Sequence, residues 1–205
     1  ALQNAAKIRN RPIPHWVVVS YLGACARVGD ATRALELHGT YFAAHLGPPA
    51  SDHPDRTALY ERARLSLAHV MSALARSGEG ARAERLLDEA LARGMTLLPN
   101  HVNALLLACV RASDSDEALR VFEARFGAAG APPPDGLSYM LLLKACVSSG
   151  DMATALEVRH RAVEAGVTLG SQVDLSVIRG FVEAGEMGSA WRVYEQAREA
   201  RGTPN

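Results

Sequence analysis

A short phrase recurs along this sequence at nearly constant intervals. Close variants of Ala-Cys-Ala-Arg begin at Ala24, Ala108 and Ala145, and a cysteine-free copy begins at Ala73. Ten residues after each phrase an alanine follows, and a fifth alanine continues the series: Ala34, Ala83, Ala118, Ala155 and Ala190, with spacings of 49, 35, 37 and 35. A period in this range is the signature of a repeat architecture, in which each repeat buries its apolar face only by stacking on its neighbours.

Helix-breaking residues divide each repeat into two helices. Five residues before each alanine of the series lies a breaker: Gly29, Gly78, Ser113, Gly150 and Gly185. A second glycine follows the alanine by eleven or twelve residues in four repeats: Gly94, Gly130, Gly166 and Gly202. Because glycine ends helices by adopting the left-handed conformation, each repeat is expected to run helix, turn, helix, stop. The predicted fold is all-α, a right-handed α-solenoid of stacked helical hairpins with ten or eleven main helices and no sheet.

The period also predicts the domain organisation. A single helical-repeat array is expected over residues 14–205, with repeats at about 14–50, 57–100, 101–135, 136–170 and 171–205. The first spacing is longer than the others, which indicates an insertion at about residues 46–56, followed by a long first helix from residue 57 to 76. Residues 1–13 are expected to form the tail of a preceding helix or an N-terminal extension.

Composition excludes several classes of function. Lys plus Arg number 22 and Asp plus Glu number 22, so positive charge for a nucleic acid would have to be local. The three cysteines suggest no disulfide framework, and their shared place in three repeats favours core packing. No metal-ligand spacing or nucleophile motif occurs, so no catalytic residue, metal or cofactor is expected. The apolar runs are too short to span a membrane.

The best-formed repeat carries a family resemblance. It begins at Leu137-Ser138-Tyr139, turns at Gly150, places Ala155 in its second helix and stops at Gly166. This pattern, with Pro-Asn or Pro-Asp after several of the stops, resembles the pentatricopeptide repeat family over roughly residues 14–205. The related tetratricopeptide repeat would place a glycine in the first helix, where this chain has Leu106, Leu143 and Ile178.

The resemblance implies RNA binding by the first helices. The implied base-reading positions are Val19, Ala68, Asn103, Met140 and Leu175. Of these, only Asn103 can make directional hydrogen bonds to a base edge, and with Asp135 it would form the family's uracil-preferring pair. Four apolar positions therefore predict weak sequence specificity.

The resemblance also implies a phosphate-contacting position near the end of each first helix. It holds Arg27, Arg76 and Arg111 in the first three repeats, then Ser148 and Glu183. Lys144 and Arg179 would partly extend the basic stripe. RNA is accordingly expected along the first three repeats, with protein covering the end that carries Glu183. The alternative interpretation is that these are ordinary solvated charges.

These expectations together favour a non-enzymatic RNA-associated scaffold. The drifted reading positions and neutral charge indicate a subunit of an organellar ribonucleoprotein assembly such as the mitochondrial ribosome, with RNA and neighbouring proteins as partners. One alternative is a freestanding organellar transcript-binding factor for RNA processing, stability or translation. Another is a tetratricopeptide-like protein–protein adaptor. The resemblance places the protein in mitochondria, or alternatively in chloroplasts.

Overall fold

The computed structural model of the 205-residue chain describes residues 13–48 and 54–200. These residues form ten α-helices and one short 3-10 helix, with no strand among them. The all-helical hairpin fold expected from the repeat period is therefore confirmed. Residues 1–12 of the expected extension, residues 49–53 of the expected insertion and residues 201–205 lie outside the described residues.

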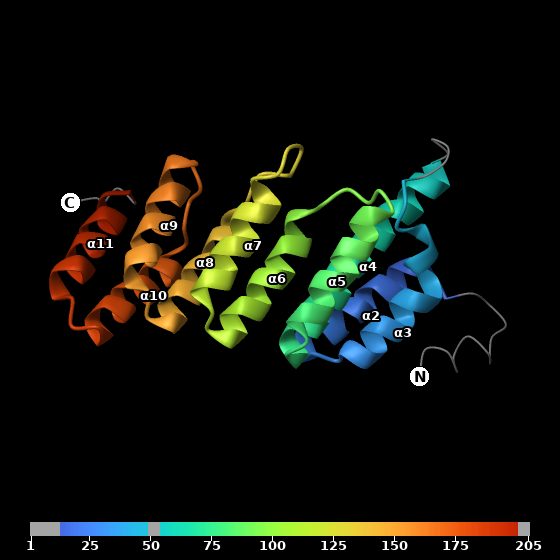
Figure 1. Cartoon of the computed structure of the whole chain (residues 1–205), viewed down its shortest axis with the longest axis horizontal. Helices are drawn as coiled ribbons and strands as arrows, with labels where there is room; N and C mark the ends of the chain where they lie inside the picture. Colours follow the sequence, from blue (N-terminus) through green and yellow to red (C-terminus); the bar gives the residue numbers. More distant parts are fainter. Residues whose placement is uncertain (1–12, 49–53, 201–205) are drawn as a thin grey trace. The chain divides into compact units, whose positions relative to one another are not determined.

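The chain divides into two compact units, residues 1–105 and 106–205. In the first unit, the helices are α2 (His15–Val28), α3 (Ala31–Tyr41), η1 (Ala43–His45), α4 (Pro54–Ser77) and α5 (Gly80–Ala92). Helix α6 (Pro99–Ala112) contains the boundary. The second unit continues with α7 (Ser115–Phe126), α8 (Gly136–Ser149), α9 (Met152–Glu164), α10 (Ser171–Glu183) and α11 (Met187–Ala200). Within each unit, successive hairpins pack side by side (Figure 1).

The turns between paired helices follow from local residue chemistry. All five breakers have a positive φ, including Ser113 at 53°, which is the only non-glycine with this conformation among the described residues. Aspartates at the starts of three second helices accept a hydrogen bond from the backbone two or three residues inside the helix: Asp30, Asp114 and Asp151. Such caps satisfy amides that have no partner within the helix. A breaker followed by an aspartate therefore positions three of the five hairpin turns.

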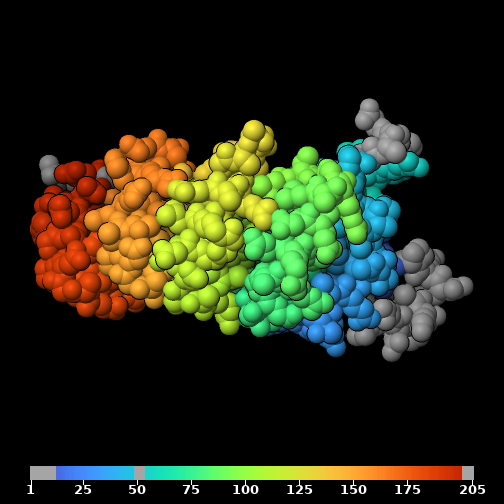
Figure 2. All heavy atoms as spheres, viewed as in Figure 1, coloured from blue at the N-terminus to red at the C-terminus, as the bar shows by residue number. Residues whose placement is uncertain are grey.

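In the second unit, contacts between neighbouring hairpins recur at equivalent positions, although the residue types differ. Phe122 of α7 packs against Tyr139 of α8, with ring centroids 5.2 Å apart. One repeat later, Arg159 of α9 donates from Nε to Asp174 of α10 at 3.1 Å. Arg159 also donates to Gln196 of α11 at 2.8 Å, and it is only 8% exposed. Each second helix is thus joined to the first helix of the next hairpin, and Figure 2 shows these neighbours in close surface contact.

No helix in the described part of the chain has the length and apolar character needed to cross a membrane.

Candidate nucleic-acid interface

Three arginines occupy equivalent places at the ends of first helices. Arg27, Arg76 and Arg111 lie in the last turns of α2, α4 and α6, and all three side chains are exposed. Within the described residues, none of the three forms an ion pair with a carboxylate. Two exposed arginines on second helices differ, because Arg82 and Arg120 are paired with Glu79 and Glu117. The three unpaired guanidiniums keep their hydrogen-bond donors available for an external anion.

Two of these arginines lie close together in the first unit. Gly29, two residues after Arg27, comes so near α4 that a Cβ at position 29 would lie 3.2 Å from Cβ of Arg76. The ends of α2 and α4 therefore meet, and their arginines lie on neighbouring helices. Arg111 holds the same place on its own helix in the second unit.

The two residues predicted to extend the basic stripe, Lys144 and Arg179, lie in different environments. Lys144 is exposed on α8 and borders a hollow. Arg179 instead lies with Nε 3.9 Å from Oε1 of Glu183, one turn along α10, and both side chains are more than 70% exposed. Glu183, which lies at the predicted phosphate position of the last repeat, therefore offsets the charge of Arg179 locally.

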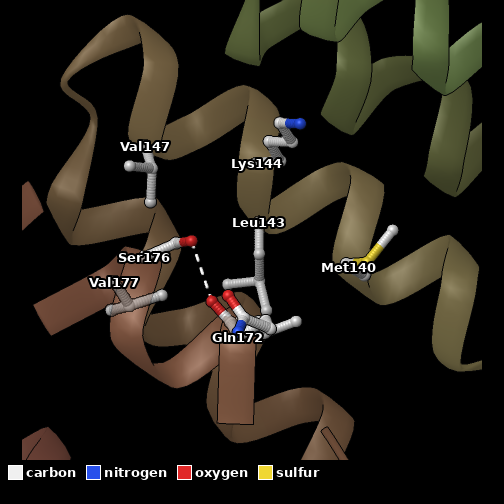
Figure 3. Close-up of a pocket in the computed structure, with 8 residues that line it drawn as sticks. Met140, Leu143, Lys144, Val147, Gln172, Ser176 and Val177 are labelled. Atoms are coloured by element: carbon white, nitrogen blue, oxygen red, sulfur yellow. Dashed lines mark hydrogen bonds between the residues drawn. The ribbon is translucent and has the colours of Figure 1, made fainter. Parts of the chain in front are cut away.

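The hollow beside Lys144 lies between two first helices of the second unit (Figure 3). Its volume is about 230 Å³, and its lining comes from α8 and α10: Met140, Leu143, Lys144, Val147, Gln172, Val173, Ser176 and Val177. The Ser176 hydroxyl donates to the backbone carbonyl of Gln172 at 2.8 Å, so this hydroxyl is already engaged. The lining is largely apolar next to one cation, and it contains no aromatic side chain on which a base could stack.

The predicted base-reading pair has a less open environment. Asn103 is only 5% exposed, so its amide presents little surface to a ligand. Asp135 caps α8: its Oδ1 accepts from Ser138 N at 2.8 Å, while Asp135 N donates to Ser138 Oγ at 3.2 Å. The Asp-x-x-Ser spacing of this capping box was readable in the sequence. A reading role for Asn103 and Asp135 stays a prediction.

The four apolar reading positions also vary in accessibility. Ala68 is buried, Val19 and Met140 are partly exposed, and Leu175 is 57% exposed. None of the four side chains offers a hydrogen bond to a base.

Two histidines are part of the core of the first unit. His38 bonds Ser66 Oγ through Nδ1 at 2.7 Å, and His101 accepts from Leu98 N at 3.0 Å while its Nε2 lies 2.9 Å from the Arg64 carbonyl. Burial lowers the pKa of each to about 4; the charge of Arg93 adds to the effect at His38, whereas the hydrogen bond to the Arg64 carbonyl opposes it at His101. Both rings are therefore neutral at pH 7 and serve as packing residues.

A third histidine, His69, lies beside the arginine position. A Cβ at Gly23 would be 3.6 Å from Cε1 of His69 and 3.9 Å from Nη1 of Arg27, so the two side chains border the same glycine. Burial, and then the charge of Arg27, lower the pKa of His69. No sequence motif assigns His69 a role; its one signal is its place directly after Ala68, a predicted reading position.

The cysteines are consistent with core residues. Cys25, Cys109 and Cys146 are buried and form no disulfide, and burial raises the pKa of the Cys146 thiol to about 11. In the described ranges, no cluster of three or more His, Cys, Asp or Glu side chains could hold a metal ion.

Comparisons with known proteins test the resemblance to the pentatricopeptide repeat family. The model of the pentatricopeptide repeat matches residues 101–124 and 137–167. The resemblance to the pentatricopeptide repeat family is confirmed. No curated protein sequence matches the chain.

Several solved structures share the pentatricopeptide-type fold. The pentatricopeptide repeat domain of protein-only RNase P 1 from Arabidopsis thaliana, solved in complex with tRNA, has a TM-score of 0.65 at 15% identity, with 94% of this chain and 93% of that one covered. The nuclear proteinaceous RNase P 2 of A. thaliana has a TM-score of 0.64 at 14% identity, with 92% of this chain covered. This chain spans only 39% of that enzyme. The maize pentatricopeptide repeat protein PPR10 has a TM-score of 0.54 at 20% identity, with 91% of this chain and 30% of that one covered.

Proposed function

We propose that this chain is a non-enzymatic, RNA-associated scaffold that holds RNA phosphates along its first three repeats. The observation that supports the proposal most directly is the set of exposed, unpaired arginines at one position of three successive repeats: Arg27, Arg76 and Arg111. Guanidinium groups suit phosphate because their planar donors can form two parallel hydrogen bonds. The shared fold with a pentatricopeptide repeat domain solved in complex with tRNA supports RNA as the ligand class.

The far end of the second unit suits a protein neighbour. Helix α11 exposes Met187, Trp191 and Tyr194 at 64%, 59% and 46%, and the two rings lie 5.4 Å apart. The positions one repeat earlier on α9 include Met152 and Arg159, which are buried by the next hairpin. Exposed aromatic residues clustered on one face are typical of protein contact sites.

We further propose that the protein neighbours belong to an organellar ribonucleoprotein assembly, the mitochondrial ribosome being the first candidate and a chloroplast assembly the second. The apolar reading positions and the buried Asn103 favour a structural subunit over a freestanding transcript-binding factor, since a factor that selects one transcript needs polar groups facing the bases.

Salt-dependent RNA binding tests the phosphate role. Replacing Arg27, Arg76 and Arg111 with Gln should weaken the binding of single-stranded RNA, measured by fluorescence anisotropy. The plot of log affinity against log salt should flatten by about 0.7 per lost contact, or about two units for the set.

The matched control removes three arginines from the second helices of the same repeats, Arg33, Arg82 and Arg120, which are paired with carboxylates. This variant should keep nearly the whole salt slope. If the first triple variant binds RNA with unchanged affinity and slope, its arginines are ordinary surface charges and the proposal fails.

A further inference from the structure

Two side chains from different helices border one open position in the first unit. Gly23 lies on α2, and a Cβ there would be 3.6 Å from Cε1 and 3.8 Å from Nε2 of His69 on α4. The same atom would be 3.9 Å from Nη1 of Arg27, one turn further along α2. Because glycine has no side chain, the imidazole edge and the guanidinium flank a space that any larger residue would partly fill.

The ring of His69 is available to a ligand, unlike the two core histidines. His69 is half-buried and makes no hydrogen bond within the described residues. In the part of the chain that the structure describes, Nε2 of His38 is the one fully buried side-chain nitrogen or oxygen without a hydrogen-bond partner. Neither ring nitrogen of His69 is therefore fully buried, and either can bond an external group.

The charges around His69 favour an anion. Arg27 is the charged group whose field acts on the imidazole. On α3, which also packs on α4, Arg33 is bonded to Tyr21 and paired with Asp30, and His38 is bonded to Ser66. On α5, Arg82 is paired with Glu79. A cation, a titratable ring and an absent side chain thus come together, and no carboxylate among the described residues acts on the pKa of His69.

We propose that Arg27 and His69 form one phosphate site in which His69 takes up a proton when RNA binds. The inference rests on the proposed RNA function and adds to it a second ligand and a dependence on pH. In the free protein, Arg27 and partial burial keep the imidazole neutral. A phosphate placed at the site attracts both cations, so the pKa of His69 rises on binding. By linkage, RNA affinity must rise as pH falls through that range.

The test measures RNA affinity of the full chain between pH 8 and pH 6 at constant ionic strength. The wild-type protein should bind single-stranded RNA several-fold more tightly at pH 6, with a ceiling of about tenfold for each unit by which the pKa of His69 rises. His69→Gln should bind more weakly than wild type and, unlike wild type, should gain no affinity between pH 8 and pH 6. His160→Gln, which removes an exposed histidine from α9, should keep the gain.

A direct readout does not depend on any variant. The pKa of His69, followed by the NMR shift of its Cε1 proton, should rise when a short single-stranded RNA is added. Inorganic phosphate alone, added in place of RNA, should raise it less, because it lacks the neighbouring contacts.

The outcomes separate the two proposals. RNA binding that does not change with pH, or that changes equally in His69→Gln, overturns the His69 site and leaves the arginine proposal standing. An unchanged pKa of His69 in a complex saturated with RNA also overturns the His69 site and leaves the arginine proposal standing. If RNA does not bind at any pH, both proposals are overturned.

Discussion

At the scale of single residues, burial separates histidines that maintain the fold from one that faces solvent. His101 is fully buried, and its neutral ring satisfies both nitrogens, accepting from Leu98 N and meeting the Arg64 carbonyl. Protonation would remove the acceptor and place a charge in the core. The same penalty applies to His38, whose Nε2 has no partner among the described residues. These two rings make the stability of the first unit sensitive to acid.

We predict that the chain loses stability as the pH falls from 7 to 5. The pKa of His38 and of His101 is about 4 in the folded state and 6.5 in the unfolded chain, so the unfolded chain binds more protons in this window. Stability is full above about pH 6.5 and decreases toward pH 4, by about 2 kcal/mol per histidine at pH 5. Urea unfolding at pH 7 and pH 5 measures the loss.

His101→Asn keeps an acceptor for Leu98 N but cannot titrate in this range. In this variant, the loss of unfolding free energy between pH 7 and pH 5 should be about half that of the wild type, whatever the substitution does to stability at pH 7. His160→Asn, at an exposed position, should leave the loss unchanged. An identical loss in wild type and His101→Asn would show that His101 does not cause it.

At the scale of helices, small residues set how closely the elements approach. Ala118, Ala155 and Ala190 are 0%, 0% and 4% exposed, and each lies on the second helix of a hairpin. Gly180 plays a similar part on α10, since a Cβ there would be 2.9 Å from the sulfur of Met152 on α9. Close approach brings Asp174 within reach of Arg159, where a buried ion pair needs good geometry to offset its desolvation.

Ala155 is predicted to face α8, the partner of α9 within the hairpin, so Ala155→Leu should overpack that contact and lower the free energy of unfolding by about 1–3 kcal/mol. Chemical denaturation followed by circular dichroism measures the change. Ala153→Leu, on the exposed side of α9, is the matched control and should have an effect within about 0.5 kcal/mol. Equal midpoints for wild type and Ala155→Leu would mean that α9 turns a different face to its partner.

At the scale of the whole molecule, the described residues include three exposed arginines that can bind phosphate, but few polar side chains at the predicted base-reading positions. We predict that unrelated single-stranded RNAs bind within about tenfold of each other, a range of about 1.4 kcal/mol. The chain should also remain with ribosomal particles after RNase treatment, because the α11 face would be held by protein. A hundredfold preference for one RNA, together with release by RNase, would favour the freestanding transcript-binding factor.

The sequence alone was sufficient to predict the helical hairpins, because their signals are local. Glycine or Ser113 at the turn and Asp30, Asp114 or Asp151 after it act through the backbone of a few neighbouring residues. The alanine period then predicted which faces are buried.

Only the tertiary structure decided which polar residues are free to meet a ligand. Asn103 is buried, and Arg159 is held by Asp174 and Gln196. His69 and Arg27 both border Gly23. In the sequence, His69 lies 42 positions from Arg27 and 46 positions from Gly23. Such contacts depend on the register between stacked helices, which no local signal specifies, and burial sets both the pKa and the accessibility of each group.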